Sequence, residues 1–94
     1  MKSRLLLNHL ESKSIIKVGG AFDAMSAKLV ESHGFDAIWA GSFAISAIHN
    51  VPDASILTMT EFFTAASNMA NACEIPVIAD CDTGYGDATN VRYM

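Results

Sequence analysis

The chain has 94 residues, of which 51% are hydrophobic and 17% charged, and its formal net charge is −4. This is enough apolar material for one small globular unit, and the mild acidity argues against a surface that binds nucleic acid. The six Lys and Arg residues are scattered, so no basic patch predicts binding to RNA, DNA or an anionic membrane.

The hydrophobic residues are spread along the sequence. No eighteen of them run together, and the start of the chain, residues 1–9, stops being apolar too soon for a secretory signal. Cys73 and Cys81 are the two cysteines and form no CxxC motif, so the sequence predicts neither a disulfide framework nor a zinc site. We therefore expect a soluble cytoplasmic protein.

The first third of the sequence predicts a helix, a strand and a second helix. Residues 1–12 place leucines on one side of a short helix, which we expect to lie over the end of a core. Residues 15–20 predict a strand closed by a glycine pair. Residues 22–32 carry apolar side chains at helical spacing, and His33-Gly34 is a typical helix end.

The middle of the sequence predicts a strand, a loop and the clearest helix. Residues 35–40 are interpreted as the second strand. Residues 43–52 are apolar without a clean period, and we interpret them as a loop with at most one helical turn. Thr58 and Glu61 have the spacing of a capping box, and the apolar residues behind them recur at three- and four-residue steps as far as Cys73.

The end of the sequence completes a repeating βα order. Residues 75–79 predict a third, buried strand, and residues 88–94 predict the start of another helix. Strands that alternate with helices predict the α/β class, with a parallel sheet and right-handed crossovers. Because a complete (β/α)₈ TIM-type barrel takes ~250 residues, we interpret residues 1–94 as a single incomplete barrel domain. It would be the N-terminal portion, a helix plus about three βα units, or the opening third of the fold.

Polar residues follow the second and third predicted strands, at the edge where chemistry collects in parallel α/β proteins. Asp80 and Asp82 stand at i and i+2 on a glycine-containing turn, and such a pair either caps that turn or cradles a hard cation such as Mg²⁺. Gly41-Ser42 is either an ordinary turn or a backbone nest for an anion. Asp53 is either a turn residue or a base, nucleophile or electrostatic guide.

The remaining polar and aromatic candidates have weaker signals. The three histidines lie on different predicted segments and share no ligand spacing, so we expect surface or helix-end positions for them. Trp39 could pack in a core or line a pocket, and we favour a pocket wall for Tyr85, which sits within the glycine turn. Cys81 points away from the two carboxylates by strand alternation, which favours packing over nucleophilic work.

Three motifs in order give the chain a family resemblance. They are Gly34-Phe35-Asp36-Ala37-Ile38-Trp39-Ala40, Val51-Pro52-Asp53 and Asp80-Cys81-Asp82-Thr83-Gly84-Tyr85-Gly86. The chain resembles the phosphoenolpyruvate mutase/isocitrate lyase superfamily over nearly its whole length, and within it most resembles the phosphoenolpyruvate mutase and phosphonopyruvate hydrolase branches. The resemblance implies a (β/α)₈ barrel that assembles as a homo-oligomer, a dimer of dimers, and binds Mg²⁺ and a small α-keto acid or phosphonate.

The resemblance also assigns roles to the three aspartates. The residue that matches Asp80 contacts the metal directly and lies against the substrate, whereas the residue that matches Asp82 reaches the metal mainly through water. The residue that matches Asp53 lies beside the reacting group, as nucleophile or guide. Asp53 is therefore our expected catalytic residue, and Asp80 and Asp82 are our expected Mg²⁺ ligands.

A second group of residues is implied to bind the substrate. In the family, the residue that matches Trp39 lines the pocket, and backbone amides matching Ser42 and Phe43 hold the pyruvyl carboxylate; Gly41 belongs to the same turn. The family pattern at this turn is Trp-x-Ser-Gly, so serine and glycine are exchanged here. Amide contacts survive that exchange, but a non-glycine residue at position 42 is costly if its φ is positive.

The resemblance implies an isomerase in phosphonate metabolism. We expect a Mg²⁺-dependent phosphoenolpyruvate mutase, which interconverts phosphoenolpyruvate and phosphonopyruvate. A phosphonopyruvate hydrolase and a lyase that acts on 2-methylisocitrate-like acids are the enzymatic alternatives, and a non-catalytic assembly fragment is the alternative outside enzymes. For residues 1–94 alone we expect no turnover, because the family's lid and phosphate-gripping residues match no part of this sequence.

Overall fold

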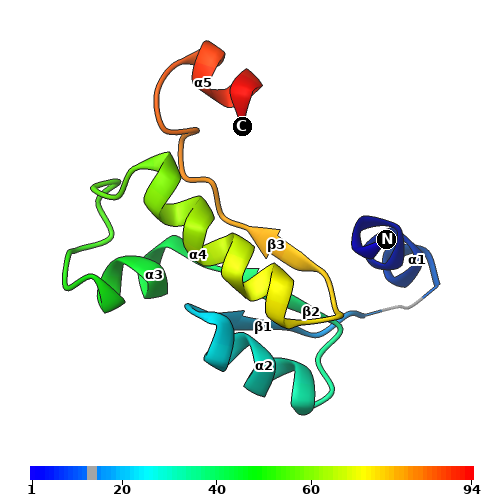
Figure 1. Ribbon diagram of the computed structural model, residues 1–94. Coiled ribbons are helices and arrows are strands. Elements are labelled where there is room, and N and C mark those ends of the chain that lie inside the picture. The colour runs from blue at the N-terminus through cyan, green and yellow to red at the C-terminus, as the bar shows by residue number, and fades with distance from the viewer. Residues whose placement is uncertain (13–14) are drawn as a thin grey trace.

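The computed structural model describes residues 1–12 and 15–94 as alternating helices and strands (Figure 1). In chain order the elements are α1 (Lys2–Ser12), β1 (Val18–Ala21), α2 (Ala24–Ser32), β2 (Ala37–Ala40), α3 (Ser42–Ile48), α4 (Met59–Ala72), β3 (Val77–Ala79) and α5 (Ala88–Tyr93).

The described strands form one parallel sheet in the order β1-β2-β3. Gly20 pairs with Trp39, and Trp39 pairs with Ile78, so residues at these positions share one face of the sheet. Because the strands are parallel, their carboxyl ends lie at one edge. This arrangement confirms the predicted α/β class with a parallel sheet.

One face of the sheet is covered by α2 and α4, which lie side by side across it (Figure 1). The largest fully buried side chains between these layers are Ile38 from β2, Ile45 from α3, and Phe62 and Met69 from α4. Close approach of α2 to β1 requires a residue without a side chain at Gly19, because a Cβ there would lie 2.6 Å from Val30 Cγ1. The core therefore sits between the sheet and these helices.

The opposite face of the sheet carries no helix from the described residues. Trp39 points to this face and is 41% exposed, and Val18 on β1 is also exposed. In a closed barrel this face is the interior. The side chains that alternate with the buried ones, Trp39 among them, therefore face the space that the rest of a barrel would enclose.

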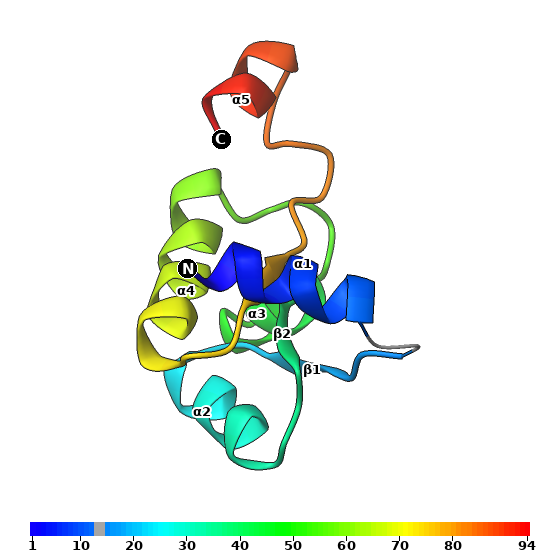
Figure 2. The same ribbon diagram turned by 90° about the vertical axis from the view of Figure 1, so that its right-hand side faces the viewer.

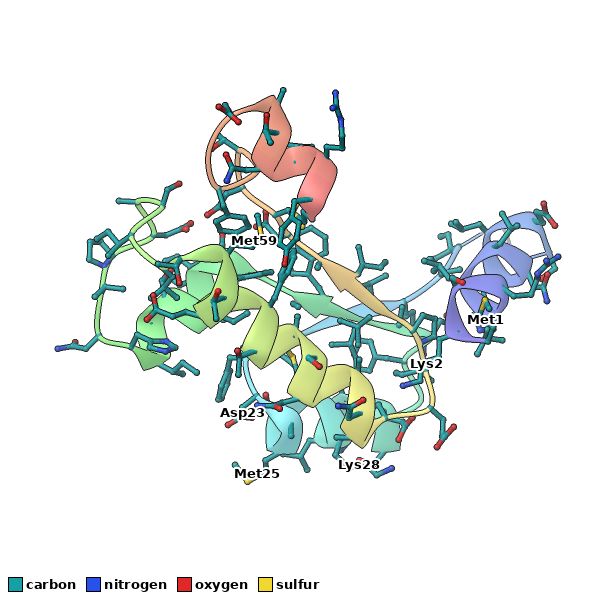
Figure 3. The ribbon with its side chains drawn as sticks, turned by 45° about the horizontal axis from the view of Figure 1, so that its top comes forward. Met1, Lys2, Asp23, Met25, Lys28 and Met59 are labelled. Carbon is teal, nitrogen blue, oxygen red and sulfur yellow. The ribbon has the colours of Figure 1, made fainter. Side chains whose placement is uncertain are left out.

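Helix α1 lies at the end of the sheet where the strands begin (Figures 1 and 2). The Lys2 ammonium reaches from α1 to the backbone carbonyl of Ala70, near the end of α4 (Figure 3). The helix lies at the predicted end of the sheet, but it buries none of its residues there, and Leu7 and Leu10 are 47% and 58% exposed. Among the described residues, no helix is both long and apolar enough to cross a membrane.

All three strands begin later than predicted, β3 at Val77 rather than at Ile75. β1 begins at Val18 rather than at Ile15, and β2 begins at Ala37 rather than at Phe35. The reason for the late starts of β1 and β2 is a local clamp: the Asp36 carboxylate accepts a hydrogen bond from the Lys17 N–H at 2.9 Å, and the Asp36 N–H donates to the Lys17 carbonyl at 2.8 Å. A side chain therefore takes the place of the strand ladder at this point.

The predicted loop over residues 43–52 is wrong in its first half. Residues 42–48 form helix α3, whose buried positions are Ser42, Ile45 and Ser46. These three positions have helical spacing, but two of them are serines, so the hydrophobic pattern conceals the buried face. The chain turns into α3 directly from β2 through Gly41.

Helix α4 begins at the capping box that the sequence predicts, and α2 begins at a second box that was not predicted. The Thr58 hydroxyl accepts from the Glu61 N–H at 3.2 Å and the Glu61 carboxylate accepts from the Thr58 N–H at 3.0 Å, which confirms the predicted capping box of α4. Asp23 and Ser26 form an equivalent box that delays the start of α2 to Ala24. Gly34, with a φ of 82°, ends α2 as predicted.

Candidate active site

The expected site residues lie at the carboxyl edge of the sheet. The Asp80 N–H donates to the Ala40 carbonyl at 3.0 Å, so the pairing of β3 with β2 continues one residue beyond β3. This bond fixes Asp80 beside the turn that leads from β2 into α3. Two segments that lie 38 residues apart in the sequence, at Ser42 and Asp80, are thereby brought together.

One serine hydroxyl joins two of the expected carboxylates. Ser42 Oγ lies 3.0 Å from Asp80 Oδ2 and 3.1 Å from Asp53 Oδ1. The Ser42 N–H also points at Asp80 Oδ2, at 3.4 Å. Ser42 is buried, with 6% of its surface exposed, whereas Asp53 projects from an exposed loop. The structure therefore brings together Asp53, Ser42 and Asp80 from three different segments.

Asp80 and Asp82 also form a turn, which was predicted for this pair as the alternative to cation binding. The Asp82 N–H donates to Asp80 Oδ1 at 3.1 Å, which is an Asx-turn. Asp80 uses its other oxygen toward Ser42, so its role at this edge is not limited to the turn. The Asp82 residue is exposed, and its backbone is held at a φ of 46°.

The donor atoms at this edge suit a hard cation. Asp80 and Asp82 present carboxylate oxygens, and Mg²⁺ binds through one or two carboxylates while it keeps several waters. Within residues 1–12 and 15–94, no three His, Cys, Asp or Glu side chains gather closely enough to form a metal cage. The residues present therefore fit Mg²⁺ better than a cation that needs an all-protein site.

The glycine turn after Asp82 is shaped by contacts that only glycine permits. Gly84 has a φ of 97°, and a Cβ there would lie 2.2 Å from Val91 Cγ2. Tyr85 follows with a φ of 61° and packs its ring 5.8 Å from Phe62 and 6.0 Å from Phe63, measured between centroids. The turn thus carries a large aromatic ring back onto α4.

Tyr85 serves both as core and as pocket wall. It packs against the hydrophobic core and also lines a pocket of about 380 Å³ together with Thr58, Met59 and Asp82. Burial is the main cause that raises the pKa of the Tyr85 phenol, and the negative charge of Asp82 adds to it. Tyr85 is therefore a neutral hydroxyl at the pH of a cell.

The turn around Gly41 has no strained backbone. Gly41 has φ −87° and ψ 138°, which any residue adopts, and Ser42 is not among the described residues with positive φ. The exchange of serine and glycine relative to the family pattern therefore costs no backbone strain. Gly41 is constrained by its neighbour instead, because a Cβ there would lie 2.9 Å from Trp39 Nε1.

Phe43, Trp39 and Cys81 are sequence neighbours of the site residues described above. Phe43 is 72% exposed at the start of α3, next to Ser42, and Trp39 lies on the open face of the sheet at the end of β2. Burial and the nearby aspartates raise the pKa of the Cys81 thiol, and its Sγ contacts the Ala79 carbonyl at 3.6 Å. A neutral thiol agrees with the prediction that Cys81 packs rather than attacks.

The Ser42 hydroxyl was not predicted as a functional group. The sequence and the family resemblance pointed to the Ser42 amide, since the family pattern has glycine at this position. A usable signal was present, because a serine that starts a helix at the end of one strand can reach a carboxylate that ends the neighbouring strand. The register of β2 against β3, which brings the two together, is not readable from the sequence.

The parallel α/β order of the chain matches the structures of TIM-barrel-type proteins. The family model described as phosphoenolpyruvate phosphomutase matches residues 7–94, so the chain belongs to this family. Members with mutase, hydrolase and lyase activities are all similar to it. The family resemblance inferred from the three motifs is thereby confirmed.

Individual relatives show how close the similarity is. The chain is 45% identical over 83 residues to 2,3-dimethylmalate lyase of Eubacterium barkeri, an alignment that covers 87% of this chain and 29% of the lyase. The crystal structure of phosphoenolpyruvate phosphomutase from Streptomyces platensis subsp. rosaceus superposes with a TM-score of 0.96 at 43% identity, covering 99% of this chain and 32% of that one.

A third relative contains a metal. The crystal structure of phosphonopyruvate hydrolase in complex with oxalate and Mg²⁺ matches with a TM-score of 0.95 at 39% identity, over 100% of this chain and 33% of the hydrolase. The chain thus spans about a third of the length of the relatives it matches.

Proposed function

We propose that the whole protein is a Mg²⁺-dependent phosphoenolpyruvate mutase, an isomerase that interconverts phosphoenolpyruvate and phosphonopyruvate. The observation that carries this proposal is the junction at Ser42, whose hydroxyl lies 3.0 Å from Asp80 and 3.1 Å from Asp53. It unites the expected metal ligand and the expected catalytic carboxylate at the edge where barrel enzymes place their chemistry. Membership of the phosphoenolpyruvate phosphomutase family supports the same assignment.

In this proposal the cation is held by the β3 turn. Asp80 would bind Mg²⁺ directly and Asp82 would bind it through water, as oxygen ligands in a partly hydrated site. When bound, Mg²⁺ supplies electrophilic polarisation of a substrate oxygen. The Mg²⁺ and oxalate in the similar phosphonopyruvate hydrolase structure support this choice of cation.

The substrate would lie against the turn between β2 and α3. The amides of Ser42 and Phe43 would hold the substrate carboxylate, with Gly41 keeping the backbone close and the Trp39 indole forming the wall beside it. The Ser42 N–H faces Asp80 Oδ2 at 3.4 Å, so this amide already points toward the cation ligand. Carboxylate and cation would therefore bind side by side.

Asp53 would act on the phosphoryl group that moves between oxygen and carbon. Its carboxylate extends from an exposed loop to the buried Ser42 hydroxyl, which orients it toward the strand ends. From there it serves as the nucleophile that accepts the phosphoryl group or as the charge that guides its transfer.

Product identity tests the proposal. The whole protein is incubated with phosphonopyruvate and Mg²⁺ and the products are followed by ³¹P NMR, with an excess of EDTA as the control. We expect phosphoenolpyruvate to form with Mg²⁺ and not with EDTA. Inorganic phosphate and pyruvate would instead assign a hydrolase. Inertness toward phosphonopyruvate with cleavage of a 2-methylisocitrate-like acid would assign a lyase, an outcome that the 45% identity to a lyase makes the main alternative.

The proposal extends to assembly and location. We propose a homo-oligomer, a dimer of dimers, in the cytoplasm, where free thiols such as those of Cys73 and Cys81 stay reduced. In the described sheet β1 and β3 each have one unpaired side, which also motivates the alternative of a non-catalytic assembly fragment. Sedimentation of residues 1–94 distinguishes the enzyme from the assembly fragment. A well-behaved monomer without turnover would contradict the assembly fragment.

A further inference from the structure

The Ser42 hydroxyl faces two carboxylates but has one hydrogen. Ionised carboxylates only accept hydrogen bonds, so at any moment the Ser42 hydroxyl donates either to Asp80 or to Asp53. The carboxylate that does not receive this hydrogen then faces the Ser42 oxygen with no proton between the two oxygens. The two distances, 3.0 Å and 3.1 Å, are nearly equal. The hydroxyl therefore has two alternative acceptors at almost equal distance.

The two partners differ in how firmly they are held. Asp80 is fixed by its backbone bond to Ala40 and by the Asx-turn with Asp82. Asp53 lies in the exposed segment 52–56. Among the described residues, the contact with Ser42 is the only side-chain hydrogen bond that any residue of this segment makes to another element. The Ser42 hydroxyl is thus the attachment point of the segment.

The segment around Asp53 is also strained. Ser55 has a φ of 56°, a region that costs such a residue about 1–3 kcal/mol. Asn50, with a φ of 57°, instead ends α3 in a Schellman motif, in which the Asn50 N–H donates to the Ala47 carbonyl at 2.9 Å and the Val51 N–H to the Ser46 carbonyl at 3.1 Å. A conformation such as that of Ser55 persists only where surrounding contacts hold it. Loss of the Asp53 attachment would therefore let residues 52–56 relax away from the carboxyl edge.

A cation at Asp80 would change the competition for the hydrogen. A carboxylate whose charge is engaged by a divalent cation is a weaker hydrogen-bond acceptor, whereas Asp53 keeps its full charge. We infer that Ser42 is a positioning residue that couples the two sites: cation binding at Asp80 directs the Ser42 hydroxyl to Asp53 and fastens residues 52–56 over the carboxyl edge. This inference rests on the metal assignment in the proposed function, and not on the identity of the reaction.

Hydrogen exchange with and without Mg²⁺ tests the coupling. Exchange of residues 52–56 in the whole protein is measured by mass spectrometry, after calorimetry has set a saturating Mg²⁺ concentration. In the wild type we expect Mg²⁺ to slow exchange in this segment about tenfold, the effect of one hydrogen bond to a charged group. In Ser42→Ala we expect fast exchange in both conditions, with Mg²⁺ affinity within a few-fold of the wild type.

Ser46→Ala is the matched control. Ser46 has the same side chain, lies one turn further along α3 and is equally buried at 4% exposure, but it contacts neither aspartate. We expect this variant to keep the Mg²⁺-dependent slowing. Ser42→Thr, which retains the hydroxyl, should keep it as well, so that a packing defect in Ser42→Ala is told apart from loss of the hydroxyl.

The outcomes separate this inference from the proposed function. If Mg²⁺ slows exchange of residues 52–56 equally in Ser42→Ala and in the wild type, or if saturating Mg²⁺ leaves wild-type exchange unchanged, the coupling is overturned while the metal site stands. If the wild type does not bind Mg²⁺, the metal assignment falls and the coupling falls with it. Failure to form phosphoenolpyruvate, with the slowing intact, would overturn only the proposed reaction.

Discussion

At the scale of single residues, Asp53 combines an exposed position with a buried partner. Its carboxylate lies 3.1 Å from the Ser42 hydroxyl, and that hydroxyl lies among residues packed at the start of α3. A catalytic carboxylate needs both a fixed direction and access to a substrate. The Ser42 contact supplies the direction, and the exposed loop supplies the access.

Replacement of this charge should slow the proposed reaction without loss of the fold. In Asp53→Asn the side-chain oxygen still accepts from Ser42, but the negative charge is gone, so we expect kcat to fall about 100-fold or more with a smaller change in KM. Asp87→Asn is the control, because Asp87 caps α5 and Asn caps equally well. Steady-state kinetics with phosphonopyruvate measures both variants; a kcat for Asp53→Asn within twofold of the wild type contradicts the role of Asp53.

The sequence predicted the acidic residues of the site but not what joins them. Asp80 and Asp82 stood out because a strand ended just before them, and their turn also provides the Asx geometry that was the competing interpretation. The Ser42 hydroxyl was overlooked because its two partners lie 11 and 38 residues away in the sequence. Contacts of that kind depend on strand register and loop path, which no local pattern contains.

At the scale of elements, one carboxylate ties α2 to the start of β3. Glu31 Oε2 accepts from the backbone N–H groups of Glu74 at 2.6 Å and Ile75 at 3.1 Å, and Glu31 Oε1 binds the Lys28 ammonium at 2.7 Å. The Glu31 side chain is 15% exposed. The bond from Lys28, followed by the bond from the Glu74 N–H, lowers the pKa of Glu31 to about 2. This clamp sets where α4 ends and β3 begins.

The clamp predicts a pH dependence of stability. Because the pKa of Glu31 is lower in the folded state, its contribution is fully present above the usual value of 4.5 and is lost as the pH falls toward about 2. We expect Glu31→Gln to lower the free energy of unfolding by about 1–2 kcal/mol at pH 6, allowing for solvent screening. Urea unfolding at pH 6 and near pH 3 measures the difference, which should shrink at the lower pH; a difference that is constant with pH would exclude this origin.

Element types were predicted better than their ends. α4 was identified by its capping box and apolar spacing, and both were confirmed. α3 was missed because Ser42 and Ser46 occupy two of its three buried positions. The late starts of β1 and β2 come from the Asp36 side chain, which bonds to Lys17 across the gap between the strands. Side chains that substitute for backbone partners therefore account for most of the errors.

At the scale of the whole molecule, the sheet is covered on one side. α2 and α4 pack on one face, and Trp39 is 41% exposed on the other (Figure 1). The parallel α/β order was predictable because strand and helix periodicities alternate along the sequence. The pairing order and register were not, because they depend on which strands meet in space. At the carboxyl edge, the register of β2 against β3 brings Asp80 beside Ser42, and the Ser42 hydroxyl holds Asp53 there.

The central claim is that this edge binds Mg²⁺ through Asp80. Calorimetric titration of the whole protein with Mg²⁺ tests it most directly, with Asp80→Asn, Asp82→Asn and Asp87→Asn compared, since each removes one negative charge. We predict saturable binding in the wild type and in Asp87→Asn, about tenfold weaker binding in Asp82→Asn, and binding weakened more than about 100-fold in Asp80→Asn. Wild-type affinity in Asp80→Asn would contradict the account.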